Sequence, residues 1–364
     1  MVRPSSHRLL LTVVGLLIFG QIVAFWPSST PRETAAPVAG SLPGEEQTSP
    51  FSGFEAPDGA APDYTIGSFR YVSVARGAKQ WELHATEARF YSPRDLVLAT
   101  EIQASLFSDA PGRDHAVRVS GRESRYSVST RVLEVGGSVV ARFPDGSELR
   151  SEYLRFDPVA RTVLIPGEYA VSGTGPASGR TRIEFRSRGL HGELARGSFS
   201  LQRDVELRAF SRAKPGAAPA IFHAARAVIE RNEGVARLLS EKTETAEGFV
   251  TLRHEGDTTL VARSRTMEVR TDAGTPGKNS SFTAIGDVRI EEWKRGTAQQ
   301  GSPFRHSTSG RAEFHPEESE FVLTEYPQAY QGEDTMTGDV IRVDRKNDRV
   351  EVENTNAISR GSYE

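Results

Sequence analysis

Residues 121–173 read GRESRYSVSTRVLEVGGSVVARFPDGSELRSEYLRFDPVARTVLIPGEYAVSG, and they give the first indication of the architecture. Apolar and polar residues alternate over 139–143 and 148–156, on both sides of the tight-turn sequence Pro-Asp-Gly-Ser at 144–147. A period of two is typical of a pleated strand, and two such runs around an Asp-Gly pair favour a β-hairpin. A third alternating run over 162–170 extends the hairpin to an antiparallel meander.

The same strand–turn–strand module recurs through the chain from residue 64 onward. Spacings are irregular, at roughly 30–45 residues, a range typical of repeats that stack on one another. Helical spacing is almost absent. The sequence therefore predicts an all-β protein of antiparallel strands in a stacked or elongated arrangement. Besides two copies in 121–173, the modules cover 81–107, 188–210, 225–252, 263–292, 310–332 and 337–359.

Composition excludes several classes of site. The chain has 364 residues, a net charge of −3 and no cysteine. Because it carries no basic footprint, we do not expect nucleic acid as a partner. Because it lacks cysteine, it has no disulfides, cysteine-based zinc sites or thiol nucleophiles.

The N-terminal part combines an apolar run with a polar linker. Residues 9–26 carry no charge and as a helix would span roughly 27 Å, close to the thickness of a bilayer core. Basic residues precede this run, so we expect a cytoplasmic tail at 1–8, a retained transmembrane helix at 9–26 and export of the rest. A cleaved signal peptide is the alternative. Residues 27–63, rich in Pro, Ala, Ser and Gly, indicate a flexible tether, although Phe51 and Phe54 could dock on the folded part.

One Pro-, Gly- and Ala-rich break, SRAKPGAAPA at 211–220, interrupts the strand region. We therefore expect a boundary there, between a β domain at 64–210 and a second β domain at 221–364.

The sequence holds no recognisable catalytic arrangement. Its eight histidines are scattered, without short metal-ligand spacing, and there is no G-x-S-x-G motif. Two carboxylates could still meet in space, as in glycosidases. We expect no catalytic residues, no metal and no cofactor, and therefore a protein that is not an enzyme.

Apolar residues at two-residue spacing remain as the candidate site. An ordinary dry core between two sheets and a groove for apolar ligand chains would use the same pattern. We assign the following residues to this apolar inner face: Trp81, Leu83, Phe90, Leu96, Leu98, Ile102, Leu106, Val139, Phe143, Leu154, Phe156, Val288, Ile290, Phe321, Leu323, Ile341 and Val343.

Behind the apolar run, residues 81–88 carry W-x-L-x-A-x-x-A, and LVLATEIQASLF follows at 96–107. With these motifs the N-terminal half resembles LptC, the membrane-anchored periplasmic component of lipopolysaccharide export. An entering strand that ends in Tyr126, a Gly-x-Val-type strand at 137–140 and a Ser-x-x-Leu-x-Phe-Asp return at 151–157 resemble the OstA-like pattern of this system.

Three segments stand out in the C-terminal half: AIGDVRI at 284–290, GRAEFHPEESEFVLTEYPQAYQG at 310–332 and GDVIRVDRKNDRVEVEN at 338–354. With these segments the C-terminal half resembles LptA, the soluble member of the same pathway. The chain departs from an LptC in length, because it carries both halves in tandem.

The resemblance implies a fold and a function. The fold would be an elongated, twisted antiparallel β jelly roll of the OstA type, in one or two tandem units, whose interior shelters the acyl chains of lipid A. The chain would be a single-pass inner-membrane protein that passes lipopolysaccharide across the periplasm. Its partners would be the permease subunits of an inner-membrane ABC exporter and an LptA-like bridge protein joined by edge-strand pairing. A structural or adhesive exported β protein with a dry core is the alternative, and a carbohydrate-active enzyme on a β scaffold is a second one.

Overall fold

The computed structural model describes most of the chain after residue 50. The expected tail at 1–8, transmembrane helix at 9–26 and most of the expected tether, 27–50, lie outside the described residues. Within the described part, no helix is long and apolar enough to cross a membrane. The described ranges are 51–75, 78–107, 116–176, 181–212, 216–241, 248–256, 258–270, 281–294, 303–315, 320–332 and 334–358.

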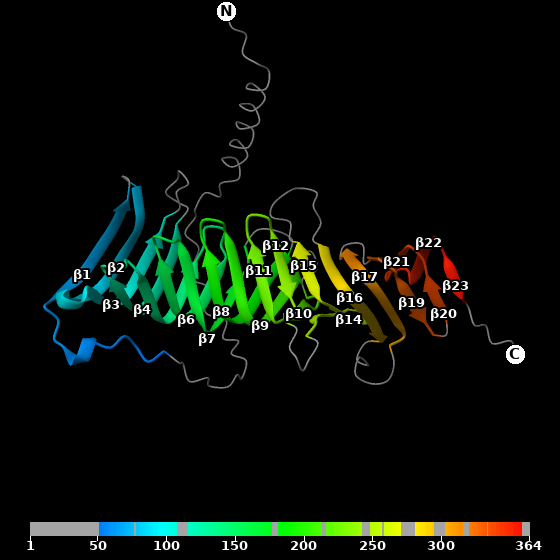
Figure 1. Cartoon of the computed structure of the whole chain (residues 1–364), viewed down its shortest axis with the longest axis horizontal. Helices are drawn as coiled ribbons and strands as arrows, with labels where there is room; N and C mark the ends of the chain where they lie inside the picture. The colour runs from blue at the N-terminus through cyan, green and yellow to red at the C-terminus, as the bar shows by residue number, and fades with distance from the viewer. Residues whose placement is uncertain are drawn as a thin grey trace, which may run out of the picture. The chain divides into compact units, whose positions relative to one another are not determined.

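The described chain consists of β-strands and two short 3-10 turns, Pro57–Gly59 and Ser92–Arg94. The first nine strands form one antiparallel meander, in which each strand pairs with the next (Figure 1). The expected all-β, antiparallel fold is confirmed. These strands are β1 (Tyr64–Ala75), β2 (Ala78–Tyr91), β3 (Leu96–Leu106), β4 (Val117–Ser127), β5 (Leu133–Arg142), β6 (Glu148–Asp157), β7 (Thr162–Thr174), β8 (Thr181–Glu193) and β9 (Ser198–Ser211).

After β9 most of the described strands are shorter and form two rows, which the long strands β16 (14 residues) and β17 (11 residues) join. The first half of β9 pairs with β11, and its second half pairs with β10. The remaining strands are β10 (Ala220–Ala224), β11 (Arg226–Glu230), β12 (Val235–Leu239), β13 (Val250–Glu255), β14 (Thr258–Ser264), β15 (Thr266–Arg270), β16 (Ser281–Lys294), β17 (Arg305–His315), β18 (Glu320–Thr324), β19 (Gln328–Gln331), β20 (Asp334–Thr337), β21 (Val340–Asp344), β22 (Arg349–Glu353) and β23 (Asn356–Ile358).

The pairings define two ladders that the long strands connect. Ladder A continues from the first half of β9 through β11, β12, β15, the first half of β16 and the second half of β17 to β18, β21 and β22. Ladder B continues from the second half of β9 through β10, β13, β14, the second half of β16 and the first half of β17 to β19, β20 and β23. Within the meander, each long strand gives one half to each ladder.

The long strands are irregular where they pass from one ladder to the other. In β5 the register shifts between Gly136 and Val139, and Gly137 has a φ of +74°. In β16 it shifts between Ile285 and Val288, and Gly286 has a φ of +78°. Glycine adopts this left-handed backbone at little steric cost, and such irregularities bend a strand. The bends allow the two halves of one strand to line the same interior from different sides.

The hairpin expected around Pro-Asp-Gly-Ser is confirmed as β5–β6. The amide of Gly146 donates to the carbonyl of Phe143 at 3.0 Å, and the amide of Phe143 donates to the carbonyl of Ser147 at 2.9 Å. The Asp145 carboxylate also accepts from the amide of Ser147 at 3.0 Å. Asp and Gly favour such turns because the Asp side chain bonds the local backbone and Gly146 takes a φ of +80°.

The two ladders enclose one apolar core, which extends from Trp81 in β2 to Val343 in β21. Aromatic contacts connect the ladders across it. Phe222 of ladder B lies 5.2 Å, between ring centroids, from Phe282 of ladder A. Phe143, at the end of the ladder B half of β5, lies 5.6 Å from Phe199 in the ladder A half of β9.

The expected domain boundary at 211–220 lies between two paired strands. Ala220 pairs with Ala209, and Phe222 pairs with both Leu207 of β9 and Leu252 of β13. Residues 49–364 form a single compact unit with a single core cluster among the described residues. The Pro/Gly/Ala-rich segment therefore does not separate two cores.

Residues 51–57 pack on the outer face of the sheet, and the amide of Asp63 donates to the carbonyl of Phe90, so this part of the expected tether is folded. The ring of Phe51 lies over Gly136 and 6.5 Å from the ring of Tyr153. The amide of Phe54 donates to the carboxylate of Glu123 at 2.9 Å. We call residues 51–63 the strap.

Candidate functional site

Most of the residues assigned to the inner face line the shared core. Phe90 and Phe143 are half-buried and pack against it. The fully buried members are Trp81, Leu83, Ile102, Leu106, Val139, Leu154, Phe156, Val288, Ile290, Phe321, Leu323, Ile341 and Val343.

Leu98 lies outside this core, so its assignment to the inner face is wrong. Leu96 is half-buried and is not part of the core cluster, but it lines the apolar opening near β1 that is described below. Val97 and Ala99 hold the core positions in this part of β3. Leu98 instead pairs across the sheet with Arg89 and Arg125, on the outer face.

The cause is an irregularity at Glu101, whose φ is +49°. Inward residues on its two sides, Ala99 and Ile102, are three apart instead of two. A simple period of two carried back from Ile102 therefore reaches the wrong face. Leu98 is nevertheless buried on the outer face. Next to it in β3, Leu96 lines a surface hollow together with Glu55 and Pro57 of the strap.

A cavity of about 300 Å³ opens into the core in the middle of the described chain. Its walls come from both ladders, and they are mostly apolar. A volume of this size is at the lower end of the range for small-molecule pockets. The apolar lining includes Phe143, Leu149, Ile183, Phe185, Leu190, Phe199, Leu201, Leu207, Ile229 and Val235.

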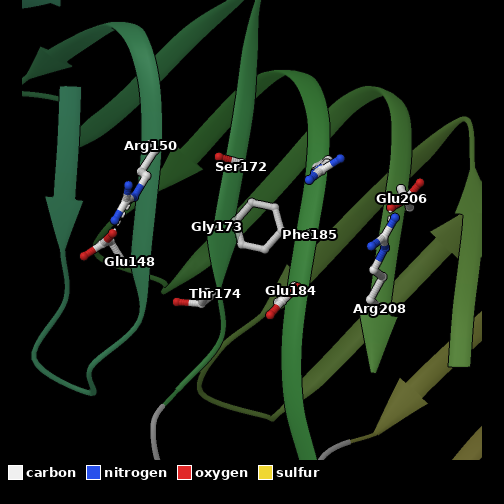
Figure 2. A pocket seen from close by; sticks show the side chains of 10 residues that line it. Glu148, Arg150, Ser172, Gly173, Thr174, Glu184, Phe185, Glu206 and Arg208 are labelled. Carbon is white, nitrogen blue, oxygen red and sulfur yellow. Dashed lines mark hydrogen bonds and ion pairs between the residues drawn. The ribbon is translucent and has the colours of Figure 1, made fainter. Parts of the chain in front are cut away.

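Phe185 separates this cavity from a charged hollow on the outer face of ladder B. Figure 2 shows its ring beside Gly173, between Glu148 and Arg150 of β6 and Glu206 and Arg208 of β9. A Cβ at Gly173 would lie 2.4 Å from the Phe185 ring, so only glycine leaves room for this ring position. Phe185 therefore lines both the cavity and the charged hollow.

An ion pair joins the two ladders at the mouth of the cavity. Arg231, in the turn after β11, donates to the carboxylate of Asp145, in the turn after β5. Burial acts to raise the pKa of Asp145, but hydrogen bonds from Ser147 and Arg231 outweigh it and lower the pKa below its usual value. The guanidinium of Arg231 lies 4.5 Å from the Phe143 ring centroid and 5.9 Å from that of Phe199.

A second apolar opening lies near β1, where aromatic side chains gather. Its volume is about 350 Å³. The rings of Tyr71, Trp81 and Tyr126 lie within 5.0–5.5 Å of one another. Burial and the hydrogen bond with Tyr71 raise the pKa of Tyr126, so its hydroxyl stays neutral at physiological pH. The Trp81 Nε1 and Ser124 Oγ atoms are buried there without a hydrogen-bond partner in the described chain.

A buried ionic network joins the ladders again in the C-terminal part. Glu292 in β16 accepts from Arg305 at 3.2 Å and from Arg345 at 2.6 Å. Arg345 also donates to Thr258 at 2.6 Å, and Arg305 donates to Asp348. Arg305 and Glu292 are 3% and 4% exposed. Removing one member of a pair buried this deeply typically costs several kcal/mol, because the remaining charge is left buried without its partner.

Among the described residues, no group of three or more His, Asp or Glu side chains is arranged to hold a metal ion. His306 stacks on Tyr330 at 4.3 Å between ring centroids, and burial lowers its pKa.

Sequence reasoning missed both the aromatic residues that connect the ladders and the ion pair at the cavity mouth. Phe199 and Phe222 follow the two-residue spacing of apolar side chains in their strands, and this signal could have placed them in the inner-face set. Arg231 and Asp145 are 86 residues apart in turns, and no sequence pattern signals their contact.

Comparisons with known proteins give a partial likeness among solved structures and none elsewhere. No family model matches the chain, and no curated protein matches it. Among solved structures, the chain is similar to LptH from Pseudomonas aeruginosa, described as the LptA-homologous periplasmic component of the conserved lipopolysaccharide transport device. The match has 16% sequence identity and a TM-score of 0.30, and it covers 39% of this chain and 96% of LptH.

Proposed function

We propose that this chain binds the acyl chains of lipopolysaccharide in the interior between its two ladders and passes the lipid along the sheet. The observation that carries the proposal is the central cavity, an apolar space of about 300 Å³ with a charged mouth, which opens into a core that both ladders share. An amphiphile needs an apolar space for its alkyl chains and polar or charged groups for its headgroup. Burying an acyl chain is worth about 0.8 kcal/mol per CH₂ group.

The proposed place is the periplasmic side of the inner membrane. The uncharged run at 9–26 would anchor the chain beside the permease subunits of an ABC exporter, which would supply the energy for transfer. The chain itself would act as a passive conduit and not as an enzyme.

The proposed route onward uses the free edges of the sheet. In the described part, β1 pairs only with β2, β22 only with β21 and β23 only with β20. Unpaired strand edges accept further strands. An LptA-like partner would add to one of them and continue the apolar interior.

Photo-crosslinking in cells tests the proposal. A photoreactive phenylalanine analogue at Phe143, which lines the cavity, or at Phe156, which lies in the core, should capture lipopolysaccharide. The matched controls are the neighbouring outward positions Arg142 and Arg155, which are exposed and should capture none. Equal capture at inward and outward positions would contradict the proposal.

The dry-core alternative makes a different prediction for the purified protein. It predicts no lipid after solvent extraction, whereas the lipid-binding function predicts lipid A species by mass spectrometry. The many core side chains with almost no exposure favour this alternative away from the two openings. The extraction experiment therefore decides between the two.

A further inference from the structure

The mouth of the central cavity is formed by two turns from opposite ladders. The β5–β6 turn brings Asp145, and the β11–β12 turn brings Arg231. Their ion pair spans the opening, and Phe143 and Phe199 lie directly beneath it. A pair of opposite charges thus lies over two aromatic rings of the cavity lining.

Arg231 has an unused hydrogen-bond donor at this place. Its Nη2 donates to Asp145, but its Nε is buried and has no hydrogen-bond partner among the described residues. A buried donor without an acceptor costs free energy, and native structures rarely retain one. An oxyanion at the mouth could accept from the guanidinium, because the fork of Arg matches carboxylate and phosphate geometry.

The other carboxylates at the mouth already have partners. Glu148 accepts from Arg142 and Arg150 at 3.0 and 2.6 Å. Glu230 accepts from the hydroxyl of Ser198 at 3.1 Å. Asp145 is therefore the group that competes with an incoming anion for Arg231.

We propose that this mouth is a lateral binding site for an alkyl amphiphile with an anionic headgroup, in which the alkyl chain enters the cavity and Arg231 binds the headgroup in exchange for Asp145. This inference rests on the proposed function and adds a point of headgroup recognition to it. The aromatic rings beneath Arg231 hold the guanidinium plane while its partner changes.

The test uses two soluble probes with the same alkyl chain, decyl phosphate and decyl glucoside, below their micelle concentrations. Binding to the full chain is measured by calorimetry. Arg231→Gln should weaken decyl phosphate binding about tenfold or more, as expected for a lost charge-assisted hydrogen bond, and leave decyl glucoside binding within about twofold. Asp145→Asn removes the competitor and should strengthen decyl phosphate binding only.

Ile183→Trp, which fills the cavity, separates this inference from the proposed function. It should weaken both probes to a similar extent. If it does so while Arg231→Gln and Asp145→Asn change neither probe selectively, headgroup recognition is overturned and lipid binding stands. If the unmodified chain binds neither probe, the site at this mouth is overturned, whereas the extraction experiment still decides the proposed function. Asp145→Asn keeps the test decisive even if Arg231→Gln reduces folding.

Discussion

Glu82 shows how a single side chain on the outer face can depend on its neighbours. It lies in β2 between two inward residues, Trp81 and Leu83, and it is 8% exposed. Hydrogen bonds from Lys79, His84 and Arg70 lower its pKa from 4.5 to about 2, although burial acts in the opposite direction. The folded state therefore holds this carboxylate in its charged form.

The lowered pKa predicts a stability contribution that acid removes. Because the folded pKa is below the unfolded value, the contribution is present above about pH 4.5 and is lost as the pH falls towards 2. Glu82→Gln should lower the urea midpoint at pH 7, and the difference from the unmodified chain should shrink between pH 4.5 and 2. Urea titrations at several pH values measure this.

Glu87→Gln is the matched control in the same strand. Glu87 is exposed and its pair with Arg89 spans 3.4 Å, so the change should stay within about 0.5 kcal/mol. A Glu82→Gln difference that is constant over the whole pH range would contradict the prediction.

At the scale of elements, the sequence predicts the positions of strands and hairpin turns well. It predicts less well which residues of a strand lie on the inner face of the sheet. The Pro-Asp-Gly-Ser turn predicts the β5–β6 hairpin because Asp145 and Gly146 favour a turn through their own side chain and backbone conformation. Leu98 is misplaced because the conformation of Glu101 depends on the neighbouring strands as well as on its own sequence. The division into two ladders, and the pair of Arg231 with Asp145, depend on contacts between distant segments that no period in the sequence records.

The strap offers a test of an element that the sequence suggested only through two phenylalanines. A Cβ at Gly136 would lie 2.0 Å from the ring of Phe51, so Gly136→Ala should displace the strap. Overpacking of this kind costs about 1–3 kcal/mol.

The expected result of Gly136→Ala is faster proteolytic cleavage within 51–63 while the strands stay protected. Gly67→Ala in β1, where nothing lies within 4 Å of the added Cβ, is the control and should leave cleavage unchanged. Equal cleavage of the two variants would show that Phe51 does not hold the strap.

At the scale of the molecule, β9 connects the regions that the sequence suggested were separate domains. Its two halves pair with β11 and β10, so both ladders continue past 211–220 without a break in pairing. The proposed lipid transfer would depend on this continuity, because acyl chains would pass between the two regions within the apolar interior. The continuity also predicts that a destabilising substitution after residues 211–220 lowers the stability of strands before them.

Phe222 is the residue at which this prediction is sharpest. It is 0% exposed, pairs with Leu207 and Leu252, and contacts the ring of Phe282. Phe222→Ala should destabilise the core by about 3–5 kcal/mol. Amide hydrogen exchange, followed by mass spectrometry, should become faster in β9 as well as in β10, β13 and β16, because all of them surround the cavity that the change creates.

Tyr326→Ala, at a side chain that is 94% exposed, is the control and should leave exchange in these strands unchanged. Faster exchange confined to residues after 220 would mean that the two regions fold independently, and a single continuous interior would then be excluded.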